Sequence, residues 1–227
     1  MKKAVLLMSG GADSTTVAAI AKSQGYMLYG LSFYYEQRHL IELEKAKLVA
    51  KKYCSEHRIV NLDLSFLKGS ALTDKKVEVP KFDNLDKLDE AVAITYVPAR
   101  NTIFLSIALA WAEVIGATDV FYGPNKTDYD TYPDCRPDYI RAFEEVSNLA
   151  TRAGVHDSKK FKIHAPLLGM SKQEVIKTGL SLGVDYSQTL TCYSPTLEGY
   201  ACGHCTSCLV RLNAFKANNI EDPAVYI

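Results

Sequence analysis

The sequence of 227 residues predicts an α/β fold in which helices cover both faces of a parallel, Rossmann-like sheet. Apolar segments of strand length alternate with helical patterns, and right-handed crossovers between such segments favour a parallel sheet. The first strand ends in the pair Gly10 and Gly11, which leads straight into a helix, as in many anion-binding folds. A chain of this length suits one large domain better than two. We therefore expect a single domain over residues 1–227 that includes a small cysteine-rich segment, residues 186–227.

Each expected element follows from a local pattern. Residues 3–8 are a continuous apolar run, typical of a buried strand, and residues 102–115 are apolar almost all round, which indicates a buried helix. Residues 171–174 have the form of a capping box, which begins a helix. Residues 69–93 show no clear period, and we expect either a lid or a plain surface excursion there. The expected strands are 3–8, 26–33, 59–64, 119–122 and 161–165, the expected helices are 14–24, 40–50, 102–115, 137–153, 171–183 and 209–217, and a polar loop is expected before Pro137.

The composition is that of a soluble globular protein. Hydrophobic residues make up 48% of the chain and charged residues 23%, and Lys+Arg and Asp+Glu both number 26. The balanced charge weighs against a nucleic-acid partner, because such proteins usually carry a basic surplus. No apolar stretch approaches the roughly 20 residues that span a bilayer, and the short apolar run at the N-terminus lacks a signal-peptide cleavage site. We expect a cytoplasmic protein with no membrane association.

Residues 9–14, Ser-Gly-Gly-Ala-Asp-Ser, are the first candidate site. Backbone amides converge where a strand, a glycine pair and a helix meet, and the helix dipole adds about half a positive charge. Asp13 is placed to hold Mg²⁺ against a departing pyrophosphate. The usual phosphate loop needs a lysine that is missing here, and the dinucleotide fingerprint is absent too. The alternative is a tight turn that binds nothing.

Four of the six cysteines fall within residues 192–208. Two Cys-x-x-Cys steps share Cys205, and Cys192 can fold over as a fourth ligand, which indicates a closed structural Zn²⁺ site formed by Cys192, Cys202, Cys205 and Cys208. An iron–sulfur cluster is the rival interpretation, and a disulfide framework does not suit a reducing cytoplasm. We expect Cys54 to lie near the end of a helix as a packed free thiol.

Three polar segments, residues 36–39, 96–101 and 128–137, follow or connect the scaffold elements. A solvated loop is the default for any one of them. Together, beside a phosphate loop and at the carboxyl ends of strands, they favour a shared pocket. His39 is either a catalytic base or a hydrogen-bonded structural histidine.

The chain resembles the PP-loop ATP pyrophosphatases, which have an adenine nucleotide alpha hydrolase-like fold, through its Ser-Gly-Gly-x-Asp-Ser loop. Within them it is similar to the 7-cyano-7-deazaguanine synthase family of queuosine biosynthesis. That narrower resemblance covers nearly the whole chain. It rests on residues 9–15, 37–39, 96–101, 132–137, 191–193 and 201–208, and on Arg211.

The resemblance implies that ATP and ammonia convert 7-carboxy-7-deazaguanine to the 7-nitrile, through an acyl adenylate and an amide, in a homodimer with one zinc per subunit. It implies an ATP loop formed by Met8, Ser9, Gly10, Gly11, Ala12, Asp13, Ser14, Thr15, Thr16, Val17 and Ala18. Phosphate or carboxylate contacts are expected from Arg38, Arg100 and Arg136, and base recognition or proton handling from Asp128 and Asp134. Further substrate contacts are expected from Gln37, His39, Asn101 and Tyr132.

The chain departs from the family pattern at Tyr34 and Glu36 and across residues 124–131. These changes leave open a second function, in which the activated carboxylate is transferred to another amine. A tRNA sulfur transferase would share the adenylation, but the balanced charge and the cysteines assigned to metal weigh against it. A zinc-binding module without catalysis is the fourth hypothesis.

Overall fold

The structure is a computed structural model that describes residues 1–35, 37, 40–74, 76–83, 85 and 94–227. Its strands form one parallel sheet in the order β3-β2-β1-β4-β5. The chain therefore adds β2 and β3 on one side of β1, and then crosses over to add β4 and β5 on the other side. The strands are β1 Lys2–Leu7, β2 Tyr26–Tyr34, β3 Cys54–Asn61, β4 Asp119–Phe121 and β5 Lys162–His164.

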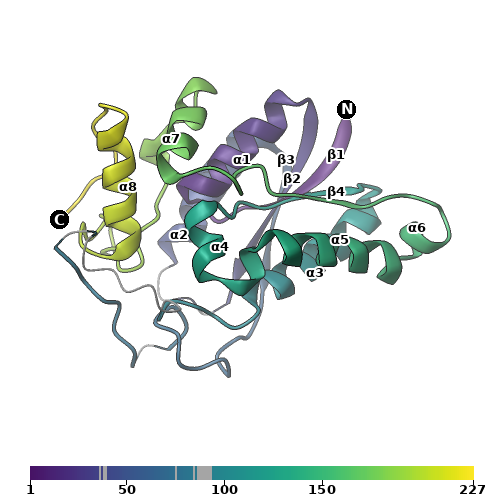
Figure 1. Ribbon diagram of the computed structural model, residues 1–227, viewed down its shortest axis with the longest axis horizontal. Coiled ribbons are helices and arrows are strands. Elements are labelled where there is room, and N and C mark those ends of the chain that lie inside the picture. The colour runs from purple at the N-terminus through teal and green to yellow at the C-terminus, as the bar shows by residue number, and fades with distance from the viewer. Residues whose placement is uncertain (36, 38–39, 75, 84, 86–93) are drawn as a thin grey trace.

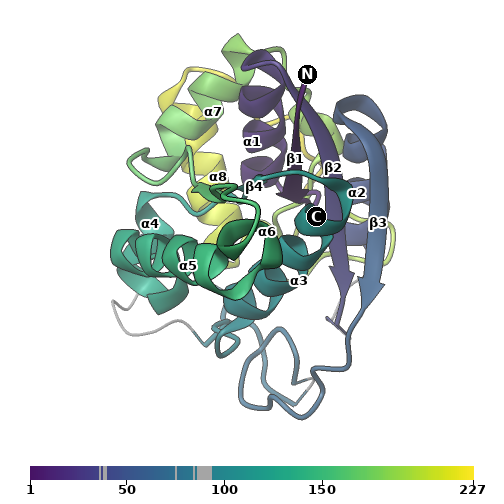
Figure 2. The ribbon, with the colours of Figure 1, turned by 90° about the vertical axis from the view of Figure 1, so that its right-hand side faces the viewer.

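Helices cover both faces of this sheet, as predicted. Figures 1 and 2 show α1, α7 and α8 grouped on one side and α3, α5 and α6 grouped on the other. The helices are α1 Ala12–Ser23, α2 Ile41–Tyr53, α3 Arg100–Ile115, α4 Lys126–Thr131, α5 Pro137–Ala150, α6 Arg152–Val155, α7 Lys172–Ser181 and α8 Thr206–Ala217, with short 3-10 turns at Pro133–Cys135 and Tyr186–Gln188.

The side chains on the two faces of β1 belong to two separate hydrophobic cores. Ala4 and Leu6 pack against α1, α2, α7 and α8, whereas Val5 packs against α3 and α5. Successive side chains of a strand point to opposite faces, so a strand buried on both sides reads as a continuous apolar run. The C-terminal segment joins the first core through Phe215, which is buried beside Tyr186.

Two local predictions were wrong. Cys54 is the first residue of β3 and lies outside α2, because the strand begins there by pairing with Leu28 of β2. The start of β3 is polar and lies at the sheet edge, so hydrogen bonds to β2 define it and no apolar pattern marks it. Cys54 is a free thiol, as expected, and burial raises its pKa to about 12.

The polar loop expected before Pro137 contains the helix α4. Asn125 accepts a hydrogen bond from the amide of Thr127, and the Asp128 carboxylate accepts one from the amide of Asn125, so a capping box begins the helix. By contrast, the capping box predicted for residues 171–174 is present at the start of α7.

The described parts of the connection between β3 and α3 lie at the end of the molecule where β2 and β3 finish (Figure 2). No helix among the residues described is long and apolar enough to cross a membrane.

Candidate active site

The loop between β1 and α1 rests directly on the first turns of α2. Gly10 has a φ of +79°, and a Cβ added there would lie 2.5 Å from the amide nitrogen of Ala46 and 2.7 Å from the carbonyl oxygen of Glu42. Only glycine fits both the conformation and the space. The contact fixes the loop against α2, and it is fixed again where Leu190 donates a backbone hydrogen bond to the Gly10 carbonyl.

The hydroxyl groups of the loop are held in a small network. Ser9 Oγ lies 3.0 Å from Ser14 Oγ and accepts a hydrogen bond from the amide of Gly11. Gly11 is the N-cap of α1 and offers no side chain to the first-turn amides of that helix. Backbone amides and the helix dipole at this point are suited to an anion, and anion binding by the loop stays a prediction.

Asp13, in the first turn of α1, is paired with Lys172 at the start of α7. The lysine Nζ lies 2.6 Å from both carboxylate oxygens of Asp13, and both side chains are largely buried. Asn125, also buried, reaches the same carboxylate from the other side with its Nδ2 at 3.5 Å. Three distant segments therefore meet at Asp13.

A cavity of about 290 Å³ opens beside this loop. Met8, which follows β1, and Gly123, which follows β4, both line it. β1 and β4 are the neighbouring strands at which the strand order reverses, and ligands of open α/β sheets bind at the carboxyl ends of such strands. The cavity thus lies where this topology places a ligand.

Arg100, half-buried at the start of α3, supplies a positive charge to the cavity. Burial alone would lower the pKa of this guanidinium, but the hydroxyl groups of Tyr35, Tyr193 and Tyr132 raise it, so the charge is retained. Among the described residues its one hydrogen bond runs from Nη1 to the Tyr35 hydroxyl at 3.3 Å, which leaves further donors for an anion.

Asn101 lines the cavity next to Arg100 and is held by Asp134. One Asp134 oxygen accepts from the Asn101 amide at 2.9 Å, and the other accepts from its Nδ2 at 3.3 Å. The preceding residue, Ala99, is in the left-handed conformation with φ 53°, which costs about 1–2 kcal/mol for a residue with a Cβ. Asp134 is buried and does not line the cavity, so its contacts make it a positioning residue for the start of α3.

Asp128 and Tyr132 both line the cavity. Burial, followed by the charge of Asp13, raises the pKa of Asp128 to about 6. The Tyr132 hydroxyl lies 2.9 Å from Thr95 Oγ1, which comes from the connection before α3. An acid that titrates near neutrality beside an aromatic hydroxyl is suited to the edge of a heterocyclic base.

The remaining predicted residues are placed differently. Gln37 lines the cavity, but its side-chain amide bonds to the backbone of Tyr35 and Phe33. Arg136 is exposed at the start of α5 and does not line the cavity. Glu36, Arg38 and His39 lie outside the described residues. The roles of all these residues stay predictions.

The four cysteines of the C-terminal segment come together as the sequence predicts. Their sulfur atoms all lie within 4.8 Å of one another, and all four side chains are buried. Two pairs, Cys202 with Cys208 and Cys192 with Cys205, have sulfur atoms 4.0 Å apart. Tetrahedral bonds of about 2.3 Å to one zinc ion would place sulfur atoms ~3.8 Å apart, so the donors fit such an ion.

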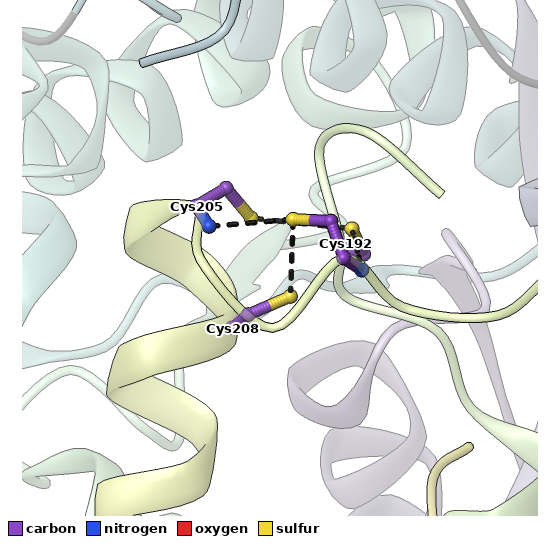
Figure 3. A group of neighbouring side chains, drawn as sticks. Cys192, Cys205 and Cys208 are labelled. Carbon is purple, nitrogen blue, oxygen red and sulfur yellow. Dashed lines mark hydrogen bonds between the residues drawn. The ribbon is translucent and has the colours of Figure 1, made fainter. Parts of the chain in front are cut away.

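The cysteine cluster is adjacent in sequence to residues that line the cavity. Figure 3 shows Cys205 and Cys208, at the start of α8, directed toward Cys192 from a separate loop. Thr191 and Tyr193, the two neighbours of Cys192, line the cavity. Closing the cysteine cluster therefore fixes one wall of the candidate active site.

Comparisons with known proteins identify the family. A family model described as "Queuosine biosynthesis protein QueC" matches residues 3–219. A 7-cyano-7-deazaguanine synthase of Rickettsia rickettsii (strain Sheila Smith) is 55% identical over 227 residues, covering 100% of this chain and 99% of the relative. One of the same name from Rickettsia canadensis (strain McKiel) is 54% identical over 228 residues and covers 100% of both chains. The chain belongs to the QueC family.

The family resemblance predicted from the sequence motifs is thus confirmed. A crystal structure described as a predicted subunit of tRNA methyltransferase from Methanocaldococcus jannaschii matches this QueC family member with a TM-score of 0.50. The two are 18% identical, and the match covers 80% of this chain and 76% of the other. That match supports the predicted α/β fold alone.

Sequence reasoning missed two charged residues that line the cavity of this QueC family member, Lys172 and Glu42, and it missed Asn125, whose side chain reaches Asp13. Lys172 belongs to the capping-box segment, and its charge at the first position of α7 was a usable signal, because cations are unfavourable at helix N-termini unless they have another partner. Glu42 sits in an ordinary-looking amphipathic helix, and nothing in the local pattern distinguishes it from Glu44.

Proposed function

We propose that this chain is a 7-cyano-7-deazaguanine synthase that uses ATP to convert 7-carboxy-7-deazaguanine and ammonia to the 7-nitrile. The observation that carries the proposal is the 55% identity to synthases of that name along the full length of both chains. The loop at residues 9–14 and the positively charged Arg100 line one cavity, which offers a site for this reaction.

The loop at residues 9–14 binds the β- and γ-phosphates of ATP in this scheme. The carboxylate of the substrate attacks the α-phosphorus, a new P–O bond forms, and pyrophosphate leaves. Loop amides and Lys172 stabilise the negative charge that grows on the pyrophosphate, an effect that is large in a preorganised site. Asp13 would hold Mg²⁺, which neutralises phosphate charge when it is bound.

Arg100 orients the substrate carboxylate or the α-phosphate, and Asp128, Tyr132 and Asn101 bind the deazaguanine base. Ammonia then replaces AMP to give the amide, and a second adenylation on the amide oxygen allows elimination to the nitrile. This order follows the chemistry of the predicted family, and the positions of these side chains around one cavity support it.

The four cysteines bind one structural Zn²⁺ in this proposal, because a closed set of four thiolates leaves no open position for chemistry. We also propose that residues 1–227 are one domain, since Phe215 and Ala214 of the cysteine-rich segment share a core with α1. A homodimer in the cytoplasm, where thiols stay reduced, completes the proposal.

The test is to incubate the purified chain with the carboxylic acid, ATP, Mg²⁺ and ammonium, and to measure the 7-cyano product together with AMP and pyrophosphate. We expect all three products from the wild type and a loss of at least about 100-fold in Asp13→Ala. Adenylation without any 7-cyano product would favour transfer to a different amine. Full activity in Asp13→Ala would contradict the role given to the loop.

A further inference from the structure

Glu42, near the start of α2, is a cavity carboxylate that the scheme above does not use. It lines the cavity, and its own backbone carbonyl lies against Gly10 of the phosphate loop. Its side chain has no hydrogen bond or ion pair with any described residue. The close packing of Gly10 on α2 fixes Glu42 next to the loop at which the adenylate is formed.

The other acidic side chains of the cavity already have partners. Asp13 is paired with Lys172, and Asp128 accepts the hydrogen bond that begins α4. Burial raises the pKa of the Cys135 thiol well above its ordinary value, so it remains protonated. Among the described acids that line the cavity, Glu42 is thus the one whose side chain has neither a hydrogen bond nor an ion pair with another described residue.

Burial raises the pKa of Glu42 to about 7, and the charge of Arg100 lowers it only in part. A carboxyl group in this state releases and accepts a proton at the working pH, which is the property of an efficient general base. The described charged and titratable groups that line the same cavity are Arg100, Lys172, Asp13, Asp128, Cys135, Tyr35, Tyr122, Tyr132 and Tyr193.

We propose that Glu42 binds the ammonium ion and takes a proton from it, so that ammonia is released beside the acyl adenylate. This inference rests on the proposed function. The nitrogen lone pair attacks the carbonyl carbon, a C–N bond forms, and the C–O bond to AMP breaks. The first proton passes from ammonium to the Glu42 carboxylate and then to water. The second passes from the nitrogen of the adduct to the departing phosphate oxygen.

A cation is the ligand that suits Glu42 best. A lone carboxylate beside a phosphate loop repels ATP unless a cation accompanies it. Lys172 is bound to Asp13, and no ion pair joins Arg100 to Glu42 in the described structure. Ammonium is a small cation that the reaction itself consumes, so one group can both hold it and activate it.

The experiment compares Glu42→Gln with a matched control, Glu44→Gln. Glu44 is exposed on the same helix and forms a surface ion pair with Lys47. Two reactions are measured: exchange of labelled pyrophosphate into ATP in the presence of the acid without ammonium, and product formation at varied total ammonium and pH. Glu42→Gln should keep the exchange rate within about twofold and raise the KM for total ammonium at neutral pH by roughly 10–100-fold.

The pH profile identifies the mechanism. In the wild type, kcat/KM for total ammonium should rise through about pH 7 and then level off, because ionised Glu42 supplies ammonia from ammonium. In Glu42→Gln it should keep rising by about tenfold per pH unit, since only free ammonia reacts. Identical profiles would overturn the inference.

Loss of the exchange reaction in Glu42→Gln would also overturn it, because Glu42 would then serve adenylation through Mg²⁺ or Arg100. A wild type that adenylates the acid but makes no amide or nitrile from ammonium would instead refute the proposed function, and this inference with it. Failure of the inference alone is thus distinguishable.

Discussion

At the residue scale, the ion pair of Asp13 with Lys172 is the contact that bears most directly on the proposed binding of ATP. Lys172 contacts both oxygens of the carboxylate at 2.6 Å. In the proposed scheme, Mg²⁺–ATP would share Asp13 with this lysine. Lys172 from α7 would then take the place of the phosphate-binding lysine that the loop sequence lacks.

Lys172→Ala should lower kcat/KM for ATP by roughly 10²–10³-fold, because it removes a preorganised positive group from the pyrophosphate site. The measurement is pyrophosphate release at varied ATP. Lys177→Ala is the matched control, since Lys177 is exposed on the same helix. Equal activity of the two variants would show that Lys172 has no part in the reaction.

At the element scale, α7 packs against Tyr186 so closely that only glycine fits at the contact. A Cβ on Gly179 would overlap the hydroxyl group of Tyr186. That hydroxyl cannot move away freely, because it lies 2.7 Å from Thr16 Oγ1 of α1 and donates to the carbonyl of Val175. The helix carrying Lys172 is thus located by a buried hydrogen-bonded tyrosine.

Gly179→Ala should lower the free energy of unfolding by about 1–3 kcal/mol, although alanine normally favours a helix interior. Urea denaturation measures the change. Gly169→Ala is the control, because a Cβ there meets nothing within 4 Å. In a Tyr186→Phe background, which lacks the obstructing oxygen, the cost of Gly179→Ala should shrink, and an unchanged cost would contradict this explanation.

At the scale of the whole molecule, the cysteine cluster ties the C-terminal segment to the active site. Cys192 lies between Thr191 and Tyr193 of the cavity wall, while Ser207, from the start of α8, also lines the cavity and donates to the Thr191 carbonyl at 2.6 Å. Loss of the metal should therefore disturb the substrate pocket as well as the fold.

Cys205→Ser should abolish metal binding, whereas the wild type and Cys54→Ser should each carry one zinc per chain by elemental analysis. The melting temperature of Cys205→Ser should fall by several degrees, since each kcal/mol shifts it by ~2–4 °C in a chain of this size. Iron in the wild type would overturn the zinc assignment in favour of an iron–sulfur cluster.

The linear pattern alone determined the fold class, the glycine loop between β1 and α1, the start of α7 and the cysteine cluster. Each of these depends on interactions between near neighbours in the chain: a glycine pair between strand and helix, a capping box, or thiols at ligand spacing. The start of β3 and the helix α4 escaped prediction, because a polar edge strand and a short capped helix leave no hydrophobic period to read.

Only the tertiary structure decided which side chains face one another across the cavity. Lys172 and Asn125 are far from Asp13 in sequence and reach it because the strand order reverses beside β1. Glu42 and Glu44 are equivalent in the helical pattern, yet one lies in the cavity and the other in solvent. Burial and charge pairing depend on long-range packing, so the chemistry of these groups becomes visible only once the sheet and its helices are assembled.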